Sequence, residues 1–251
     1  MHAPTDPPVD DSATGPGGPH SAAAASPVAE PRQRWRLTFR RGPVAADLVG
    51  RVAIEAWQTA LEESGLALAQ LDTAGRPRVA FGAPLSAAAE GEAELAEIFL
   101  AGRIPAWRVR EALADRLPSG YELIATEDIW LGAPALPGRV VAADWRVELR
   151  PSRTDPDALA AAAQRLLAAP ALPRTRSKGG ADKVYDLRPL LEDVRVAAGP
   201  AAPQAIRLFI RTRFRPELGS GRPEEVVAAL AEECGIDLAV SRTVRERLIL
   251  T

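Results

Sequence analysis

The stretch SKGGADKVYDLRPLLEDVRV, residues 177–196, raises the first question about the fold, because a basic double-glycine loop precedes an alternating polar and apolar run. A phosphate-binding loop, the mark of many enzymes, needs several glycines and a lysine directly before a serine or threonine at a helix start. Here Ser177 precedes Lys178, and the residues that follow read as a strand. We therefore predict that Gly179 and Gly180 form a turn in a hairpin between two strands.

The predicted strands and helices follow the same order in the two halves of the chain. The second half of the chain reads as strand 144–150, helix 155–169, strand 183–190, strand 204–214, helix 222–234 and a strand or hairpin at 237–250. The first half reads as strand 34–39, helix 45–64, strand 78–81, strand 91–100, helix 104–117 and strand 121–131. Both follow the order of a split βαβ unit. We predict an α+β fold with two ferredoxin-like (βαββαβ) sandwich halves and antiparallel sheets.

Composition divides the chain into a tail, residues 1–31, an N-terminal half, 32–132, a linker, 133–142, and a C-terminal half, 143–251. The tail is rich in Pro, Gly, Ala and Ser and poor in branched apolar residues, so we expect disorder there. The chain start lacks the basic segment and apolar block of a signal peptide, and no run approaches the ~18 apolar residues of a membrane span. These features predict a cytoplasmic location without membrane contact.

Two absences limit the chemistry available to the folded part. Both histidines, His2 and His20, lie in the tail, which removes imidazole from general base catalysis or metal ligation. Cys234 is the single cysteine, so the chain lacks the thiolates of a Cys-rich zinc site or an iron–sulfur cluster. We therefore expect a protein that is not an enzyme and binds no cofactor of its own. A small enzyme using carboxylate and arginine chemistry remains a further hypothesis.

One strand places arginines and an aromatic side chain on a shared face. In residues 206–215, alternation puts Arg207, Phe209, Arg211 and Arg213 opposite the apolar positions. Such a surface is typical of sheets that hold single-stranded RNA by phosphate contact and base stacking. The other interpretation is a solvated sheet face. The 31 basic and 33 acidic residues nearly balance, which argues against a strongly nucleic-acid-directed field over the whole domain.

A glutamate-rich segment is the densest group of carboxylates. On a strand, Glu90, Glu92 and Glu94 share one face, and oxygen ligands of this kind hold hard cations. The segment has no Asn, Asp or glycine-shaped loop among these glutamates, so a solvated acidic edge is the alternative. Such charges also discourage pairing between sheet edges.

Several segments resemble one bacterial family. KGGADKVYDLRPLLEDVRV, LGSGRPEEVVAALAEECGI and VRERLIL resemble its C-terminal half, while RWRLTFRRGP and RPRVAFGAPLSAAAEGEAEL resemble its N-terminal half. The family is that of the radical SAM-linked proteins, a domain of unknown function appended to, or encoded beside, cobalamin-binding radical SAM proteins. The chain resembles a divergent member, because Val49-Gly50-Arg51-Val52 stands where the family has a Ser-His-Leu-Asp block.

The resemblance implies an accessory module that binds a partner or substrate for radical SAM chemistry carried out elsewhere. The positions it carries over in the first half are Arg36, Pro77, Arg78, Phe81, Gly82, Pro84, Glu90 and Glu94. Those in the second half are Asp186, Arg188, Arg222, Pro223 and Glu224. Asp186 and Arg188 lie two apart on the expected strand, where they could form a mutual ion pair. RNA binding by the face with Arg207, Phe209, Arg211 and Arg213 is the alternative function.

Overall fold

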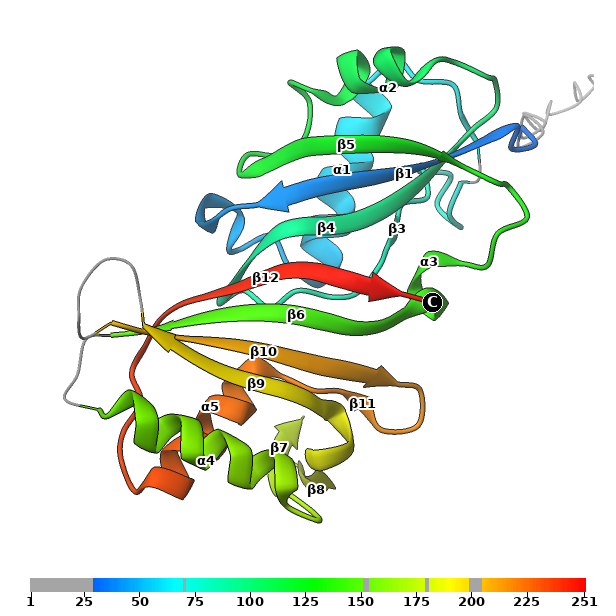
Figure 1. The fold of residues 1–251 in the computed structure, drawn as a ribbon. Coiled ribbons are helices and arrows are strands. Elements are labelled where there is room, and N and C mark those ends of the chain that lie inside the picture. Colours follow the sequence, from blue (N-terminus) through cyan, green and yellow to red (C-terminus); the bar gives the residue numbers. More distant parts are fainter. Residues whose placement is uncertain (1–28, 70, 151–153, 179–180, 199–204) are drawn as a thin grey trace, which may run out of the picture.

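The computed structural model describes residues 29–69, 71–150, 154–178, 181–198 and 205–251 (Figure 1). Nearly all of the predicted tail, residues 1–31, lies outside the described residues. In the described part of the chain, no helix is long and apolar enough to cross a membrane.

The N-terminal half contains the expected major strands and helices. Its elements are β1 (Gln33–Arg41), η1 (Pro43–Ala45), α1 (Gly50–Glu63), β2 (Leu68–Ala69), β3 (Ala80–Phe81), β4 (Ala89–Leu100), α2 (Ala106–Leu113) and β5 (Tyr121–Ile129). The alternation in β1 buries Trp35, Leu37 and Phe39 against the helices. Helix α1 ends before Gly65, whose φ of 71° requires the left-handed conformation that glycine adopts without strain.

The C-terminal half follows a short helix, α3 (Leu136–Arg139). Its elements are β6 (Val140–Leu149), α4 (Pro156–Ala168), β7 (Pro173–Lys178), β8 (Ala181–Asp186), η2 (Arg188–Leu190), β9 (Leu191–Ala198), β10 (Ile206–Arg215), β11 (Gly219–Ser220), α5 (Pro223–Cys234) and β12 (Val240–Leu250). Strand β6 begins inside the segment 133–142 that we predicted as a linker, and Leu136 of that segment is fully buried.

The two strands of the hairpin predicted around Gly179 and Gly180 are β7 and β8. β7 and β8 pair antiparallel, with Lys178 opposite Ala181, while the turn residues Gly179 and Gly180 lie outside the described residues. The strand expected at 183–190 ends earlier, at Asp186, because Arg188–Leu190 form the turn η2. Proline fits such a turn because it lacks the N–H that a strand ladder uses. A separate strand, β9, follows and was not predicted.

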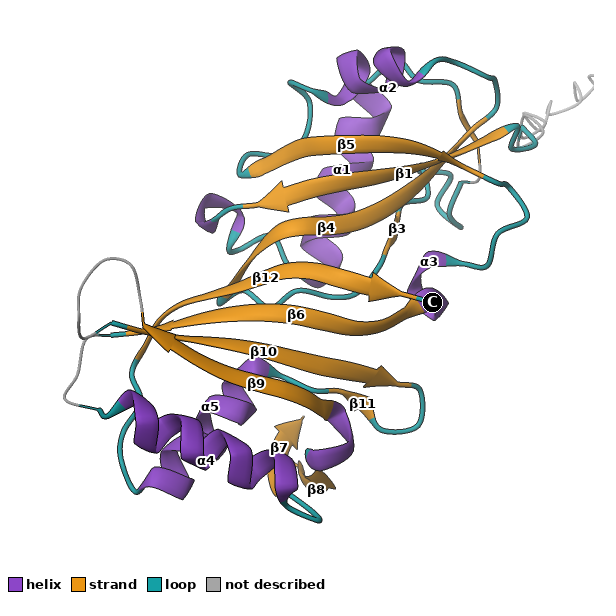
Figure 2. Ribbon diagram, viewed as in Figure 1, coloured by secondary structure: helices purple, strands orange, loops and turns teal. Residues whose placement is uncertain are grey.

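A single ten-stranded sheet runs through both halves (Figure 2). Its main path is β11-β10-β6-β12-β4-β1-β5, with β2 and β3 also paired to β4 and β9 paired to β10. The halves meet where β12 runs parallel to β4, with Thr243 opposite Ala89 and Arg245 opposite Gly91. The prediction of antiparallel sheets is therefore wrong at this seam. The fold is α+β with one mixed sheet.

Two buried hydrophobic clusters lie against this sheet. The first contains Trp35, Phe39, Trp57 and Ile98 and packs β1 and β4 against α1 and α2. The second packs α4 and α5 against strands of the C-terminal half. In Figure 2 each pair of helices lies beside its own half of the sheet. The first cluster positions one wall of the site described next.

Candidate functional site

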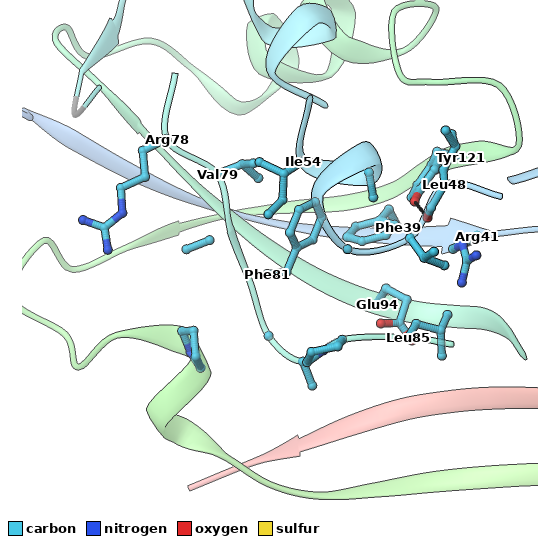
Figure 3. Close-up of a pocket in the computed structure, with 18 residues that line it drawn as sticks. Phe39, Arg41, Leu48, Ile54, Arg78, Val79, Phe81, Leu85, Glu94 and Tyr121 are labelled. Carbon is cyan, nitrogen blue, oxygen red and sulfur yellow. Dashed lines mark hydrogen bonds between the residues drawn. The ribbon is translucent and has the colours of Figure 1, made fainter. Parts of the chain in front are cut away.

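A pocket of about 460 Å³ lies in the N-terminal half, between the start of α1, the segment 78–85 and strands β1 and β4 (Figure 3). Its volume falls in the range of roughly 300–1,000 Å³ that ligand pockets occupy. Most of the 18 lining residues are apolar. Five of the positions carried over from the family resemblance line it: Arg78, Phe81, Gly82, Pro84 and Glu94.

Aromatic rings form one wall of the pocket. Phe39, Phe81 and Tyr121 line it, and Trp57 of α1 packs behind them, fully buried. The Trp57 ring centroid lies 4.8 Å from that of Phe39, 5.4 Å from that of Phe81 and 5.5 Å from that of Tyr121. Tilted and edge-on contacts of this kind are favourable arrangements of aromatic rings. The wall is therefore held in place before any ligand arrives.

Arg41 fixes the end of the pocket near Tyr121. Its guanidinium is buried and donates to the carbonyl oxygens of Ala45, Ala46, Ser86 and Ala89 at 2.9–3.3 Å. These bonds tie the η1 turn to the segment before β4. Arg41 has no carboxylate within ion-pair distance among the described residues.

Glu94 lies on the pocket wall, but its charge is already matched. Arg245 of β12 donates to both Glu94 carboxylate oxygens, through Nε at 2.7 Å and through Nη2. The same guanidinium donates to the carbonyl oxygens of Ala83 and Pro84, at 3.0 and 2.9 Å. Arg245 is 1% exposed and Glu94 is 3% exposed. A residue of the C-terminal half thereby holds both Glu94 and the pocket segment 83–84.

The remaining polar groups lie at opposite ends of the pocket. In Figure 3, Arg78 lies at one end and Tyr121 and Arg41 at the other, with Phe81 and Phe39 between them. Arg78 is exposed and makes no hydrogen bond or ion pair with any described residue. Burial raises the pKa of Tyr121 above its ordinary value of 10, although the Arg41 charge opposes the rise, so the phenol is protonated at neutral pH.

The first turn of α1 borders the pocket without a capping side chain. Val49 is the N-cap residue, it has no side-chain hydrogen bond, and the first turn contains no acidic residue. Val49, Gly50 and Ala53 line the pocket. The unpaired N–H groups of a helix start carry partial positive charge.

Arg36, a predicted site residue, lies in a buried ion-pair cluster away from the pocket. It donates to Glu97 from Nη2 at 2.8 Å, and Arg34 also donates to Glu97, from Nε at 2.9 Å. Glu97 is fully buried. Arg36 therefore stabilises the sheet through Glu97 and does not line the pocket.

The predicted alignment of three glutamates on one face fails at Glu94. A register shift in the β1–β4 ladder gives β4 one extra residue between Gly91 and Glu94, which lie opposite Arg41 and Phe39 of β1, so Glu94 leaves the alternation that Glu90 and Glu92 share. The three glutamates have different arginine partners: Glu90 pairs with Arg242, Glu92 with Arg146 and Glu94 with Arg245. Among the described residues, no group of three or more His, Cys, Asp or Glu is arranged to hold a metal ion.

The predicted arginine face exists, and carboxylates accompany it. Arg207 pairs with Glu148 at 3.2 Å, Arg211 with Asp144 at 2.6 Å and Arg213 with Glu192 at 2.9 Å. Phe209 is half-buried on this face and has the Arg195 guanidinium 6.0 Å from its ring centroid. The strand therefore presents a mixed-charge surface.

Asp186 and Arg188 do not form the ion pair that we expected. Asp186 accepts hydrogen bonds from the backbone N–H groups of Leu172 and Arg188, at 2.7 and 2.9 Å. The Arg188 side chain donates to the Leu191 carbonyl at 2.8 Å. The two residues therefore stabilise the turn after β8. Arg222 is exposed at the start of α5 and lies outside the pocket.

Several pocket residues were not predicted from the sequence. Arg41 was not singled out, since it follows the predicted strand 34–39, and Tyr121 was noted only as the first residue of the predicted strand 121–131. Arg245 had no usable signal either, because alternation on a strand places the residue after the buried Val244 on the opposite face. No local sequence pattern predicted that residues 78–85 would form one side of the pocket.

Comparison with known proteins assigns the family. Residues 74–226, more than half of the chain, match the family described as "Uncharacterized protein conserved in bacteria (DUF2344)". The chain belongs to the DUF2344 family. The DUF2344 match contains the pocket segment 78–85, Glu94 and Tyr121, whereas Phe39, Arg41 and α1 lie before it.

No curated protein matches the chain. A chain in the crystal structure of a Cbf5-Nop10-Gar1 complex is 8% identical, with a TM-score of 0.47. That similarity covers 86% of this DUF2344 chain and 48% of the other, so the present chain spans about half the length of that protein. A likeness this weak supports no statement about function.

Proposed function

We propose that this chain is a non-catalytic accessory module that binds a small, predominantly apolar ligand in the N-terminal pocket. The observation that carries the proposal is the pocket itself: about 460 Å³, bordered by the aromatic wall, and built before a ligand is present. Few polar groups among many apolar ones are typical of small-molecule sites.

The chemistry of the lining favours binding over catalysis. Its four titratable side chains are Arg41, Arg78, Glu94 and Tyr121, and they include no nucleophilic serine, cysteine or lysine. Glu94 is held in a bidentate pair with Arg245, which occupies both of its carboxylate oxygens. Tyr121 has a raised pKa and remains a neutral phenol. A general base needs a pKa near the working pH, and the raised pKa of the Tyr121 phenol lies further from it.

The strand order supports an assignment of the two halves as ferredoxin-like units. In the first half the order is β5-β1-β4-β3, and in the second it is β12-β6-β10-β9. Both equal the order 4-1-3-2 when the four strands of each βαββαβ unit are numbered along the chain. We infer that the module consists of two such units fused through the parallel seam.

The link to radical SAM chemistry is part of the proposal and rests on the sequence resemblance alone. On that basis the module presents its ligand to a separate radical SAM protein. Affinity isolation of the full chain from its own cells tests this link. Recovery of a protein that contains an iron–sulfur cluster and binds S-adenosylmethionine is expected, and its absence from repeated isolations contradicts the link.

RNA binding through the arginine face has weaker support. Arg207, Arg211 and Arg213 each have a carboxylate partner, so phosphate contacts would have to replace existing ion pairs. The hypothesis predicts RNA retention that weakens with salt and fades when these arginines become glutamate. Nuclease-sensitive RNA in the isolation described above would favour it.

Binding of a neutral apolar fluorophore, N-phenylnaphthylamine, tests the pocket directly. Ala53 lines the pocket, and Ala53→Trp places an indole in it without removing a described hydrogen bond. Val52→Trp is the matched control, because Val52 lies one position earlier, is 52% exposed and does not line the pocket. We expect fluorescence titration to show binding by the wild type and Val52→Trp and loss of binding in Ala53→Trp. Equal binding by both variants, or no binding by the wild type, rejects the proposed function.

A further inference from the structure

The charges around the pocket do not balance. Arg41 and Arg78 line it, and Glu94 is the one carboxylate among the lining residues. The charge of Glu94 is matched by Arg245, whose guanidinium bonds both carboxylate oxygens. Two positive charges on the lining therefore have no carboxylate partner in the described part of the chain.

Arg41 contributes positive potential although its hydrogen bonds are complete. Its donors all meet carbonyl oxygens, which satisfy the N–H groups but leave the formal charge in place. The group is 3% exposed, so water screens this charge weakly. Burial raises the pKa of Tyr121, and of the two nearby charges Arg41 lowers it while Glu94 raises it.

Arg78 supplies a charge that a ligand can contact. It lies at the opposite end of the pocket from Arg41, is exposed, and bonds no described residue (Figure 3). A guanidinium has a planar set of donors that matches carboxylate, sulfonate and phosphate oxygens. The uncapped first turn of α1 adds partial positive charge on the pocket border and no acid to offset it.

The carboxylates nearest this helix start do not remove the imbalance. Glu55 is paired with Arg51 at 2.6 Å on the outer surface of α1. Asp47 is exposed and is not a lining residue. The pocket therefore combines an apolar, aromatic interior with positive charge at both ends.

We infer that the pocket selects an amphipathic anion: a flat apolar body lying against Phe81 and Phe39, with one carboxylate, sulfonate or phosphate group bound by Arg78. This inference rests on the proposed function and adds the charge class of the ligand. A neutral ligand of the same shape would bind the aromatic wall and gain nothing from Arg78.

Two fluorophores with the same ring system test the inference on the full chain. Anilinonaphthalene sulfonate carries one negative charge, and N-phenylnaphthylamine is its uncharged counterpart. We expect Arg78→Gln to weaken sulfonate binding about two- to fivefold, the range of an exposed ion pair, and Arg78→Glu to weaken it about tenfold. Binding of the neutral fluorophore should stay unchanged in both variants, and added salt should weaken only sulfonate binding.

Two controls separate the possible outcomes. Arg222→Gln removes another exposed arginine, whose side chain has no partner among the described residues and which does not line the pocket, so both fluorophores should be unaffected. Ala53→Trp should block both fluorophores. If Arg78→Glu affects the two fluorophores equally, or affects neither, the anion inference is rejected, while the proposed function stands as long as Ala53→Trp still blocks binding. If Ala53→Trp blocks neither fluorophore, both are rejected.

Discussion

Arg245 and Glu94 form a buried bidentate ion pair across the seam between the two halves of the chain. The pair joins β12 of the C-terminal half to β4 of the N-terminal half. Because Arg245 also donates to the carbonyl oxygens of Ala83 and Pro84, one guanidinium connects the seam to the pocket segment. The geometry of the pocket thus depends on a residue more than 150 positions away in sequence.

Arg245→Met should destabilise the protein strongly, because it leaves Glu94 buried without a cation. Breaking one partner of a buried ion pair costs about 3–5 kcal/mol. We expect a loss of that size in the free energy of unfolding measured with urea. In the double variant Arg245→Met with Glu94→Leu, no buried charge is left, so much of the loss should be recovered. A loss below about 1 kcal/mol in the single variant would contradict the assigned role of the pair.

Replacing Glu97 should lower the free energy of unfolding more than replacing Arg36, although both residues belong to one ion-pair cluster. Glu97→Leu leaves the buried guanidiniums of Arg34 and Arg36 without this carboxylate, whereas Arg36→Met leaves Arg34 and Glu97 paired. We expect Glu97→Leu to lower the free energy of unfolding by about 3–5 kcal/mol and Arg36→Met to lower it by clearly less. Equal losses in denaturant titrations would show that the two arginines do not share Glu97 as described.

Gly120→Ala should disturb the turn that holds Arg41. Gly120 has a φ of 84°, and a Cβ there would lie 2.6 Å from the backbone nitrogen of Ala45. The left-handed conformation costs a non-glycine residue about 1–2 kcal/mol, and the clash adds about 1–3 kcal/mol. Gly65→Ala is the matched control, since its φ is 71° and a Cβ there meets no atom within 4 Å. The prediction fails if thermal unfolding gives both variants the same loss.

The ion pair between Glu90 and Arg242 should contribute to stability only above acidic pH. Hydrogen bonds from Arg242 at 2.8 and 2.6 Å lower the pKa of Glu90 below its ordinary value of 4.5. A carboxyl whose pKa is lowered in the folded state stabilises fully above the unfolded value and loses this contribution as pH falls through the folded value. Arg242→Gln should therefore be less stable than the wild type at about pH 7, by at most about 1 kcal/mol, and this difference should shrink as the pH is lowered below 4.5. A difference that persists at the lower pH would show that the lost contribution is packing and not charge.

Local patterns predicted most of the large elements, because each depends on residues close in sequence. The strand predicted at 34–39 lies within β1, and the helix predicted at 45–64 contains α1. The parallel pairing of β12 with β4 depends on contacts about 150 residues apart and left no local signature. The bulge in the β1–β4 ladder likewise takes Glu94 out of the alternation of Glu90 and Glu92, and it left no mark in the sequence.

Only part of the site could be predicted, because the rest depends on contacts between residues far apart in sequence. Arg78, Phe81 and Glu94 came from the family resemblance, and they do meet in one pocket. Arg41, Tyr121 and Arg245 complete the pocket from three other segments, and only the folded backbone brings them together. Conversely, Asp186 and Arg188 looked like a pair because a strand was expected there. The turn at Pro189 rotates them apart and gives each a backbone partner instead.

The parallel seam has a consequence for the order in which the protein is made. A ribosome releases the N-terminal half first, and domains generally begin to fold as they emerge. Until residues 240–250 have been synthesised, the β4 edge has no parallel neighbour and the Glu94 carboxylate has no guanidinium. The nascent chain therefore carries an unfinished pocket through the synthesis of the whole C-terminal half, and the binding site matures only when translation reaches β12.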